Sequence, residues 1–319
     1  MYGVFLKRKN NFNETNFLLN RNLILQNFYG KRWGIDRRVR AIFVDYVVHF
    51  HFICYLCVMK SYKVIIVGSG NVAEAFARAL RTTSHQVVQV YARNGERGKY
   101  VASLAGAEYC GCAAELKAAE LYLICVSDRA IKQVAAELPF AKGAIVAHTA
   151  GCGTLEMLPE GVRRAIVYPF QTFSIGRVVN FREIFLFVEA QDEATYNEAE
   201  AFAKSLTDNV LPADATLREK IHLTGVLTSN FVNNMYATAA EVLAGAGLDF
   251  EVVAPLIAET AAKALDSRQP AQVQTGPAVR GDMQTLERHR KLIGENEVLR
   301  KMYDIISENI WRIRETSKR

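Results

Sequence analysis

Short apolar runs alternate with amphipathic helical patterns along the middle of the chain. The runs are continuous and rich in Val and Ile, which is typical of strands buried on both faces of a parallel sheet. Because helical patterns separate them, the sequence predicts an α/β fold with a Rossmann-like, doubly wound parallel sheet. The predicted strands span residues 63–68, 86–91, 121–126, 144–147 and 184–188, with a short one near Val210.

The pattern changes after Asp214. From residue 216 onward strand signals vanish and a 3.6-residue period dominates, which predicts an all-helical C-terminal domain. The 319 residues, half of them hydrophobic, are enough for two domains. We therefore expect an N-terminal extension outside the fold at residues 1–58, a Rossmann-like dinucleotide-binding domain at 59–214 and a helical domain at 215–319.

The N-terminal extension contains an apolar stretch at residues 41–59 that follows several basic side chains. Asp45, His49 and His51 interrupt it, whereas a spanning helix needs about 20 mostly apolar residues. A cleavable signal peptide is not favoured either, because no small-residue cleavage site follows. We favour Met59 as the true start of the protein and expect no membrane association, with a membrane tether as the alternative.

Charge and cysteine content narrow the functional class. The net charge of +6 comes from residues 1–58, which hold nine of the 39 Lys and Arg and three of the 33 Asp and Glu, leaving thirty of each behind. A neutral folded body gives no support to nucleic-acid binding. The six sparse cysteines are typical of a reduced, cytoplasmic protein. The pair Cys54 and Cys57 lacks zinc-spaced partners, so we predict no metal site.

The first strand leads into a glycine-rich turn, GSGNVA at residues 68–73, and then into a helical pattern. Gly68 permits the tight turn, Gly70 lets the backbone approach a pyrophosphate, and Ala73 lets the helix pack closely on the strand. The helix N-terminus then faces the phosphates. In this strand and helix context the turn predicts a dinucleotide site. The predicted cofactor contacts here are Gly68, Ser69, Gly70, Asn71 and Val72.

The end of the second strand predicts which dinucleotide binds. NAD enzymes place Asp or Glu there, to accept hydrogen bonds from the ribose. Here the chain reads Tyr-Ala-Arg-Asn at residues 91–94, with no acidic residue before Glu96. Arg93 can instead pair with a 2′-phosphate, and Asn94 lies beside it. We therefore expect NADP rather than NAD.

Two further loops follow predicted strands and should flank the nicotinamide, since ligands of open parallel sheets bind at the carboxyl ends of strands. Ser127 and Thr149 are candidate hydrogen-bonding residues there. Capping of the helix that follows would also explain Ser127. For His148, a structural histidine is favoured over a catalytic acid.

The first long helix of the C-terminal half carries a polar stripe. At 3.6 residues per turn, His222, Ser229 and Asn233 fall on nearly one line, with Asn230 beside them. Such a stripe either lines a ligand cleft or bonds a neighbouring helix, and both alternatives stay open for Ser229 and Asn233. For His222 we favour function, because histidine is a ready proton donor to a carbonyl or imine being reduced.

A second polar cluster, TGPAVRGD, occupies residues 275–282. Gly and Pro indicate a turn, and Asp282 is suited to cap a helix beginning at Met283. Arg280 is suited to bind a substrate carboxylate or phosphate with two parallel hydrogen bonds. An ion pair between Arg280 and Asp282 is the alternative.

From Met59 to about Arg314 the chain resembles the superfamily of pyrroline-5-carboxylate reductase, ketopantoate reductase and F420-type NADP oxidoreductases. It looks most like their uncharacterised relatives that join a Rossmann-like domain to a helical C-terminal domain of unknown function. That resemblance implies a deep cleft between the domains and a homodimer formed by the helical domain. Gln171, within one of the segments that carry the resemblance, is a candidate substrate-binding residue. These segments are GSGNVA at 68–73, YPFQTFS at 168–174, HLTGVLTSNFVNNMY at 222–236 and TGPAVRGDMQTLERH at 275–289.

The chain also departs from members of known activity. It lacks the Ser-Gly-Pro and Pro-Gly-Gly-Thr segments of pyrroline-5-carboxylate reductases, and no Lys occurs between Ile221 and Ala262, where β-hydroxyacid dehydrogenases carry a catalytic one. Close relatives tend to have His at the position of Tyr168. We predict an NADP-dependent oxidoreductase acting on a small carbonyl or imine substrate, with a non-catalytic NADP-binding sensor or assembly protein as the alternative.

Overall fold

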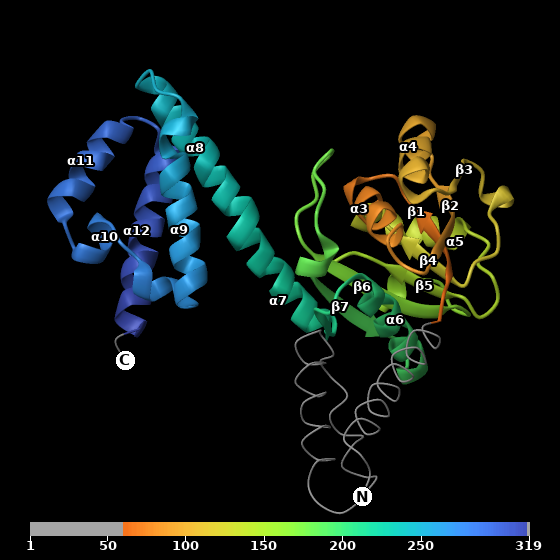
Figure 1. Ribbon diagram of the computed structural model, residues 1–319. Helices are drawn as coiled ribbons and strands as arrows, with labels where there is room; N and C mark the ends of the chain where they lie inside the picture. Colours follow the sequence, from red (N-terminus) through yellow and green to blue (C-terminus); the bar gives the residue numbers. More distant parts are fainter. Residues whose placement is uncertain (1–59, 318–319) are drawn as a thin grey trace, which may run out of the picture. The chain divides into compact units, whose positions relative to one another are not determined.

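A computed structural model describes residues 60–317 and divides the chain into two compact units, one ending at Phe231 and one beginning at Val232 (Figure 1). The predicted extension at residues 1–58, with its apolar stretch at 41–59, lies outside the described residues. Within the part of the chain that is described, no helix has the length and apolar character needed to cross a membrane.

The first unit is built on one eight-stranded sheet, in the order β3-β2-β1-β4-β5-β6-β7-β8. Neighbouring strands are parallel except for β6 and β7, which are antiparallel. The predicted Rossmann-like fold class is therefore confirmed, with an antiparallel step added near one edge. The strands are β1 (Lys63–Val67), β2 (Gln86–Tyr91), β3 (Glu108–Cys110), β4 (Leu121–Ile124), β5 (Ile145–His148), β6 (Arg163–Phe170), β7 (Phe185–Ala190) and β8 (Val210–Pro212).

Helices cover both faces of this sheet (Figure 1). Side chains of β1 alternate between the two faces: Val64 and Ile66 pack toward α3, α4 and α6, whereas Ile65 and Val67 pack toward α5. Burial on both faces explains why the strand is apolar at every position after Lys63 rather than at every second one. The helices are α3 (Asn71–Leu80), α4 (Gly95–Ala105), α5 (Asp128–Glu137) and α6 (Glu193–Leu206), with 3₁₀ turns at η2 (Ala113–Glu115), η3 (Leu155–Met157) and η4 (Phe181–Glu183).

The first unit extends beyond its last strand. It includes α7 (Ala215–Gly225) and a π-helical segment, η5 (Val226–Asn230). A Cβ on Gly225 would lie 2.9 Å from the ring of Phe170, so α7 packs closely on β6. The sheet ends near the boundary expected at Asp214, but this helix keeps the following residues within the first unit.

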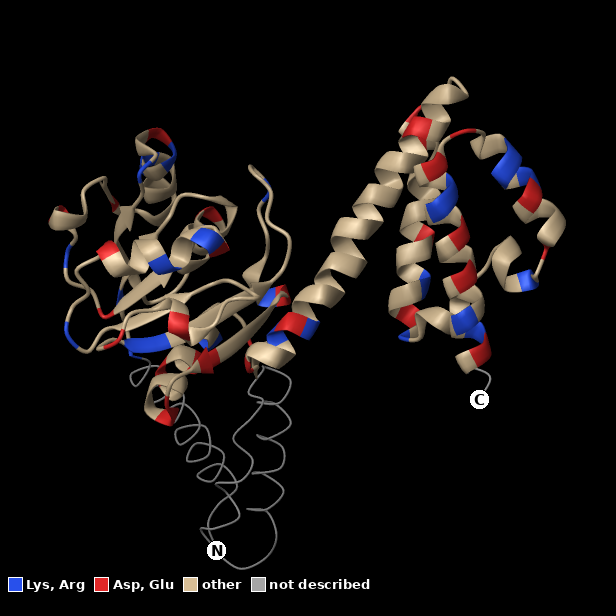
Figure 2. Ribbon diagram, turned by 180° about the vertical axis from the view of Figure 1, so that it is seen from behind, with Lys and Arg blue, Asp and Glu red and all other residues tan. Residues whose placement is uncertain are grey.

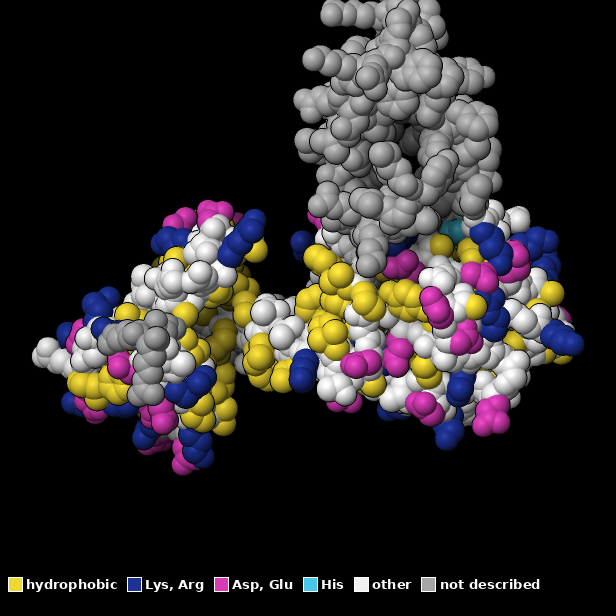
Figure 3. Space-filling model, turned by 90° about the horizontal axis from the view of Figure 1, so that it is seen from below, with side chains coloured by type: hydrophobic (Ala, Val, Ile, Leu, Met, Phe, Trp, Pro, Cys, Tyr) yellow, Lys and Arg dark blue, Asp and Glu magenta, His cyan; other side chains and the backbone are white. Residues whose placement is uncertain are grey.

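The second unit is helical throughout its described residues, and its helices leave much apolar surface uncovered. Among its described side chains, Ala278 and Leu286 are the buried hydrophobic ones. Leu265 is 76% exposed and Leu292 is 84% exposed. Apolar side chains gather over this unit in Figure 3, and Figure 2 shows that α8 is nearly free of charge. The elements are α8 (Phe231–Gly245), η6 (Phe250–Val253), α9 (Ala254–Ser267), η7 (Pro270–Val273), α10 (Pro277–Arg280), α11 (Met283–Ile293) and α12 (Glu297–Ser317).

Candidate functional site

The glycine turn is wedged between two strands. The amide of Gly68 donates to the carbonyl of Tyr91 at the end of β2, at 2.8 Å. Gly68 has φ of 124°, and a Cβ there would lie 2.8 Å from the carbonyl carbon of Cys125. Both the positive φ and the crowding exclude other side chains, so Gly68 is required by the protein's own packing.

Gly70 has different surroundings, since nothing lies within 4 Å of the position that a Cβ there would take. It precedes α3, and no side chain caps that helix. The first backbone N–H groups of α3 are therefore free to bind an anion, and the open space above Gly70 lets a phosphate approach them. Ser69 and Val72 lie in the same turn, as predicted. These features fit a dinucleotide pyrophosphate.

Asn71 has a further contact that the sequence did not indicate. Its side-chain amide donates to the carbonyl of Phe173 at 2.9 Å, which ties the glycine turn to the loop after β6. Gln171 begins that loop, and its side-chain oxygen accepts from the amide of Thr172 at 2.8 Å. Gln171 is exposed. Its predicted substrate contact stays a prediction.

Arg93 and Asn94 differ in their contacts within the protein. Asn94 caps α4, because its side chain accepts from the amide of Arg97 at 3.0 Å. Arg97 pairs with the buried Glu74 of α3, so it is not a free charge. Burial acts to raise the pKa of Glu74, but hydrogen bonds from Arg97 and Arg78 outweigh it and hold that pKa below its usual value. Arg93 is exposed at the end of β2.

Ser127 and Thr149 follow β4 and β5, as predicted, but in different surroundings. Ser127 occupies the N-cap position of α5 without a side-chain hydrogen bond to that helix, and it is exposed. Capping therefore does not account for its hydroxyl. Thr149 is buried, and its hydroxyl donates to the carbonyl of Ile124 at 3.4 Å. This bond joins the ends of β4 and β5.

His148 is a structural histidine. It is fully buried, its Nε2 lies 3.1 Å from the carbonyl of Thr154, and its Nδ1 accepts from the amide of Ala150 at 3.2 Å. This pattern places the proton on Nε2 and leaves the ring neutral. Burial lowers the pKa of His148 to about 4. The interpretation favoured from the sequence agrees with this geometry.

His222 meets Tyr168 at the carboxyl end of the sheet. Nδ1 of His222 lies 3.3 Å from the hydroxyl of Tyr168, and the two rings are 6.3 Å apart. Gly151, in the loop after β5, leaves room for both: a Cβ there would lie 3.0 Å from the Nδ1 and 2.9 Å from the Tyr168 ring. The structure thus brings α7, β6 and the β5–β6 loop together around one polar pair.

Burial and a nearby carboxylate affect the protonation of this site. Burial, together with the Cys152 side chain and the Asp128 carboxylate, raises the pKa of Tyr168 to about 12. Burial, Asp128 and Glu219 likewise raise the pKa of Cys152. Both groups therefore carry their protons at neutral pH. Gly151 and Cys152 were missed from the sequence, although a glycine pair spaced around Cys152 was a usable sign of close packing.

The polar stripe was predicted for a regular α-helix, and the long helix is not regular throughout. The segment η5 is π-helical, and the amide of Phe231 bonds to the carbonyl of Val226, five residues back. A π turn holds more residues than an α turn, so side chains beyond it are rotated away from the predicted line. Ser229 and Asn230 lie within this segment. Asn233 belongs to the second unit.

Arg280 also belongs to the second unit. It is exposed, and no ion pair with Asp282 occurs among the residues that the structure describes. Asp282 instead caps α11, accepting from the amide of Thr285 at 3.0 Å, as the sequence predicted. This hydrogen bond and that from the Thr285 hydroxyl hold the pKa of Asp282 below its usual value.

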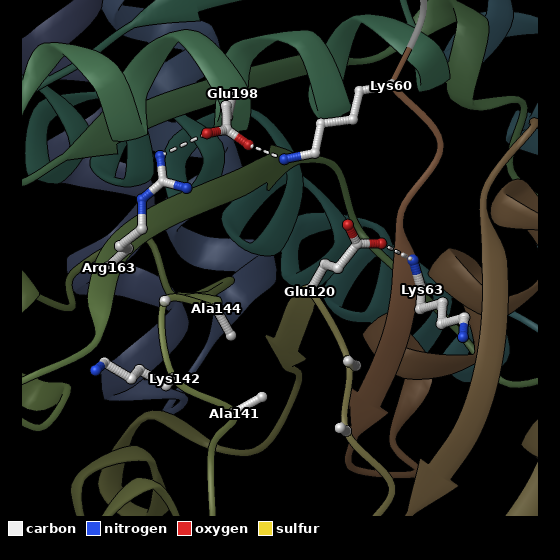
Figure 4. A pocket seen from close by; sticks show the side chains of 11 residues that line it. Lys60, Lys63, Glu120, Ala141, Lys142, Ala144, Arg163 and Glu198 are labelled. Atoms are coloured by element: carbon white, nitrogen blue, oxygen red, sulfur yellow. Dashed lines mark hydrogen bonds and ion pairs between the residues drawn. The ribbon is translucent and has the colours of Figure 1, made fainter.

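The amino end of the sheet has a different character. A cavity of about 320 Å³ lies there, and ion pairs cross its wall (Figure 4). Glu198 pairs with Lys60 at 2.6 Å and with Arg163 at 2.8 Å. Burial acts to raise the pKa of Glu198, but hydrogen bonds from Lys60, Arg163 and Tyr62 lower it to about 2. Within residues 60–317, no cluster of side chains is suited to hold a metal ion.

Two family models match the chain. Residues 63–151 match "NADP oxidoreductase coenzyme F420-dependent", and residues 184–310 match "Domain of unknown function (DUF2520)". A curated shikimate dehydrogenase-like protein from Haemophilus influenzae is 35% identical over 71 residues, which are 22% of this chain. The match spans only 26% of that relative.

Solved structures are similar over most of the described chain. A protein from Bacteroides fragilis, assigned as an NADP oxidoreductase, is 33% identical, with 79% of this chain and 98% of that chain covered and a TM-score of 0.72. A protein from Thermotoga maritima is 22% identical, covering 80% and 100% with a TM-score of 0.64. The 1-pyrroline-5-carboxylate reductase of Streptococcus pyogenes shares the fold at 14% identity, covering 80% and 99% with a TM-score of 0.53.

The glycine turn falls in the first matched region and His222 in the second. The similarity to the Bacteroides fragilis protein extends across both. The chain therefore belongs to the family of Rossmann-like oxidoreductases in which an F420-dependent-type NADP oxidoreductase domain is joined to the domain of unknown function DUF2520.

Proposed function

We propose that this protein uses NADP to reduce a small carbonyl or imine compound. The observation that carries the proposal is the Tyr168–His222 pair, which lies at the carboxyl end of the sheet that also bears the glycine turn. When bound, NADPH supplies a hydride. The chain must then bind the cofactor, hold the substrate and supply a proton.

The cofactor half of the proposal rests on the glycine turn and Arg93. The free N–H groups at the start of α3 would bind the pyrophosphate, with Gly68, Ser69 and Gly70 shaping the turn. Arg93 lies two residues beyond Tyr91, whose carbonyl bonds to Gly68. An arginine next to the adenosine end of the turn favours the 2′-phosphate of NADP over the free ribose hydroxyl of NAD.

The proton half rests on His222. In the charged form of this histidine, Nδ1–H donates to the Tyr168 oxygen and Nε2–H is left to donate to the substrate. The phenol keeps its own proton, because its pKa is raised to about 12. Tyr168 therefore orients the imidazole without competing as an anion. Ser229 and Asn230 are proposed to orient the substrate, and Ser127 to bind near the nicotinamide.

Three further parts of the proposal come from the sequence. Asn233 is proposed as the alternative to Asn230 in orienting the substrate, and Arg280 and Gln171 are proposed to bind the substrate. The protein is proposed to be cytoplasmic and to form a homodimer through its helical unit. Exposed Leu256, Leu265 and Ile305 in that unit support association, since soluble monomers rarely expose so much apolar side chain.

The test measures NADPH oxidation with a panel of small keto acids and cyclic imines. His222→Ala should lower kcat about 100-fold or more while leaving the Kd for NADPH unchanged, because the residue supplies a proton rather than cofactor contacts. His289→Gln, which alters a histidine of the second unit, is the matched control and should retain full activity. Unimpaired turnover by His222→Ala would exclude His222 as the acid.

The cofactor preference is tested separately by binding. Arg93→Gln should weaken NADPH about tenfold and leave NADH unchanged, because one charge-assisted hydrogen bond to the 2′-phosphate is lost. Equal losses for both cofactors would contradict the proposed role of Arg93. Tight NADPH binding without turnover of any substrate would favour the alternative, a non-catalytic NADP-binding protein.

A further inference from the structure

Arg218 lies one helical turn before His222 and is the largest fully buried side chain of the described residues. We infer that Arg218 is a positioning residue: its guanidinium fixes α7 to the β5–β6 loop and so sets His222 against Tyr168. This inference rests on the proposed role of His222 as the acid. Nothing in the sequence pattern singled out Arg218.

The guanidinium binds three segments that are far apart along the chain. Nη2 donates to the carbonyl of Gly153 in the β5–β6 loop at 2.6 Å. Nη1 donates to the carbonyl of Ala213 before α7 at 2.9 Å and pairs with Glu189 on β7. The two Nη nitrogens of a guanidinium are held apart in a planar fork and can reach separate segments, whereas a lysine presents all of its donors from one nitrogen.

Packing alone does not explain an arginine at this position. Burying a cation is costly, and a residue such as leucine or methionine would fill the space without that cost. The Nε of Arg218 is buried and has no hydrogen-bond partner among the described residues, so one donor of the guanidinium is left unsatisfied. The hydrogen bonds of Nη1 and Nη2, rather than packing, therefore account for an arginine at this position.

The β5–β6 loop transmits the position of Arg218 to the Tyr168–His222 pair. Gly153 accepts the bond from Arg218, and Gly151, two residues earlier, contacts both rings of the pair. His148 supports the same loop through its bond to Thr154 at 3.1 Å. Arg218 and His222 are four residues apart and share one face of α7, so a bond from one sets the position of the other.

The test compares the wild-type protein with Arg218→Lys, which keeps the charge and loses the fork. We expect kcat to fall about 10-fold to 100-fold, because small displacements of a catalytic group are costly, with the Kd for NADPH unchanged. Independently of turnover, the ring signals of His222 in an NMR spectrum should move. They are identified as the signals missing from His222→Gln.

The matched control is Arg163→Lys, which breaks a comparable arginine–carboxylate pair with Glu198 at the amino end of the sheet. It should lower the Tm but leave kcat and the His222 signals unchanged. If Arg218→Lys does not fold, Glu189→Gln is used, since it weakens the same anchor and keeps a carbonyl oxygen. We expect a smaller change of the same kind from it.

The outcomes separate the two proposals. Unchanged kcat and unchanged His222 signals in a folded Arg218 or Glu189 variant would overturn the inference, whatever happens to stability. If the wild-type protein turns over no substrate, the proposed function fails, and movement of the His222 signals still decides whether Arg218 positions that ring. A loss of Tm alone is the result expected of a merely structural arginine.

Discussion

The two ends of the central sheet carry polar groups of opposite kinds. At the amino end, Glu198 is held by Lys60, Arg163 and Tyr62, so its charge is matched within the protein. At the carboxyl end, the start of α3 has no cap and Arg93 is exposed. Charges that are compensated within the protein stabilise the fold, whereas uncapped or exposed polar groups are the ones available to bind a ligand.

The largest effect should come from the glycine turn, where two neighbouring glycines give opposite results. Gly68→Ala should cost about 2–4 kcal/mol of folding free energy, because it strains a positive φ and meets Cys125. Gly70→Val should change stability by less than about 0.5 kcal/mol and abolish NADPH binding, since its side chain enters only open space. Urea unfolding measures the stability of the two variants, and titration with NADPH measures their cofactor binding.

If Gly70→Val bound NADPH normally, the carboxyl end would not be the cofactor end. A large stability loss in that variant would show that the space above Gly70 is needed for folding. Either result would contradict the assignment of ligand binding to the carboxyl end and of stabilisation to the amino end.

An intermediate effect is expected at Tyr168. Tyr168→Phe should lower kcat about 10-fold, because His222 loses the oxygen that orients its ring. The Kd for NADPH should not change. The control is Tyr196→Phe, which removes a hydroxyl bonded to Glu200 on α6. Full activity of Tyr168→Phe in the steady state would show that the hydroxyl is dispensable for orientation.

The smallest effect should appear at the amino end. Glu198→Gln should lower stability by about 1–2 kcal/mol at pH 7, allowing for partial exposure, and leave kcat unchanged. The folded pKa, about 2, lies below the ordinary 4.5. The stabilisation is therefore present above pH 4.5 and is lost as the pH falls toward 2.

Urea unfolding across that pH range provides the measurement. The stability difference between the wild-type protein and Glu198→Gln should shrink as the pH falls from about 4.5 to about 2, because the wild-type carboxylate gains its proton. A difference that is constant with pH would mean that packing, not charge, holds α6 at this end. A reduced kcat in Glu198→Gln would show that the amino end also affects turnover.

Much of the fold followed from local pattern. The strand predicted at 86–91 matches β2, and Asp282 caps a helix beginning at Met283, as expected. These elements have strong periodicity or clear caps. The strand β6 was not among the predicted strands, because Pro169 and the polar residues near it interrupt the apolar pattern, and only its pairing with β5 and β7 defines it.

The candidate site followed only in part. Gly68 and Gly70 could be assigned from the turn, because a backbone requirement is written directly in the residue type. Thr149 was assigned as a cofactor contact, yet its hydroxyl bonds to the carbonyl of Ile124. Ser229 was placed on a line with His222 under the assumption of α-helical geometry, which the π segment alters.

The sequence by itself determined the fold class and the glycine turn after the first strand, and it singled out His222 as a candidate residue. These depend on residues close together in the chain, where periodicity and turn chemistry act. Only the tertiary structure decided that His222 meets Tyr168, that Gly151 makes room for both, and that Arg218 anchors their helix. Those contacts join residues separated by 54 and 65 positions, and no local pattern encodes which distant carbonyl or hydroxyl a side chain will reach.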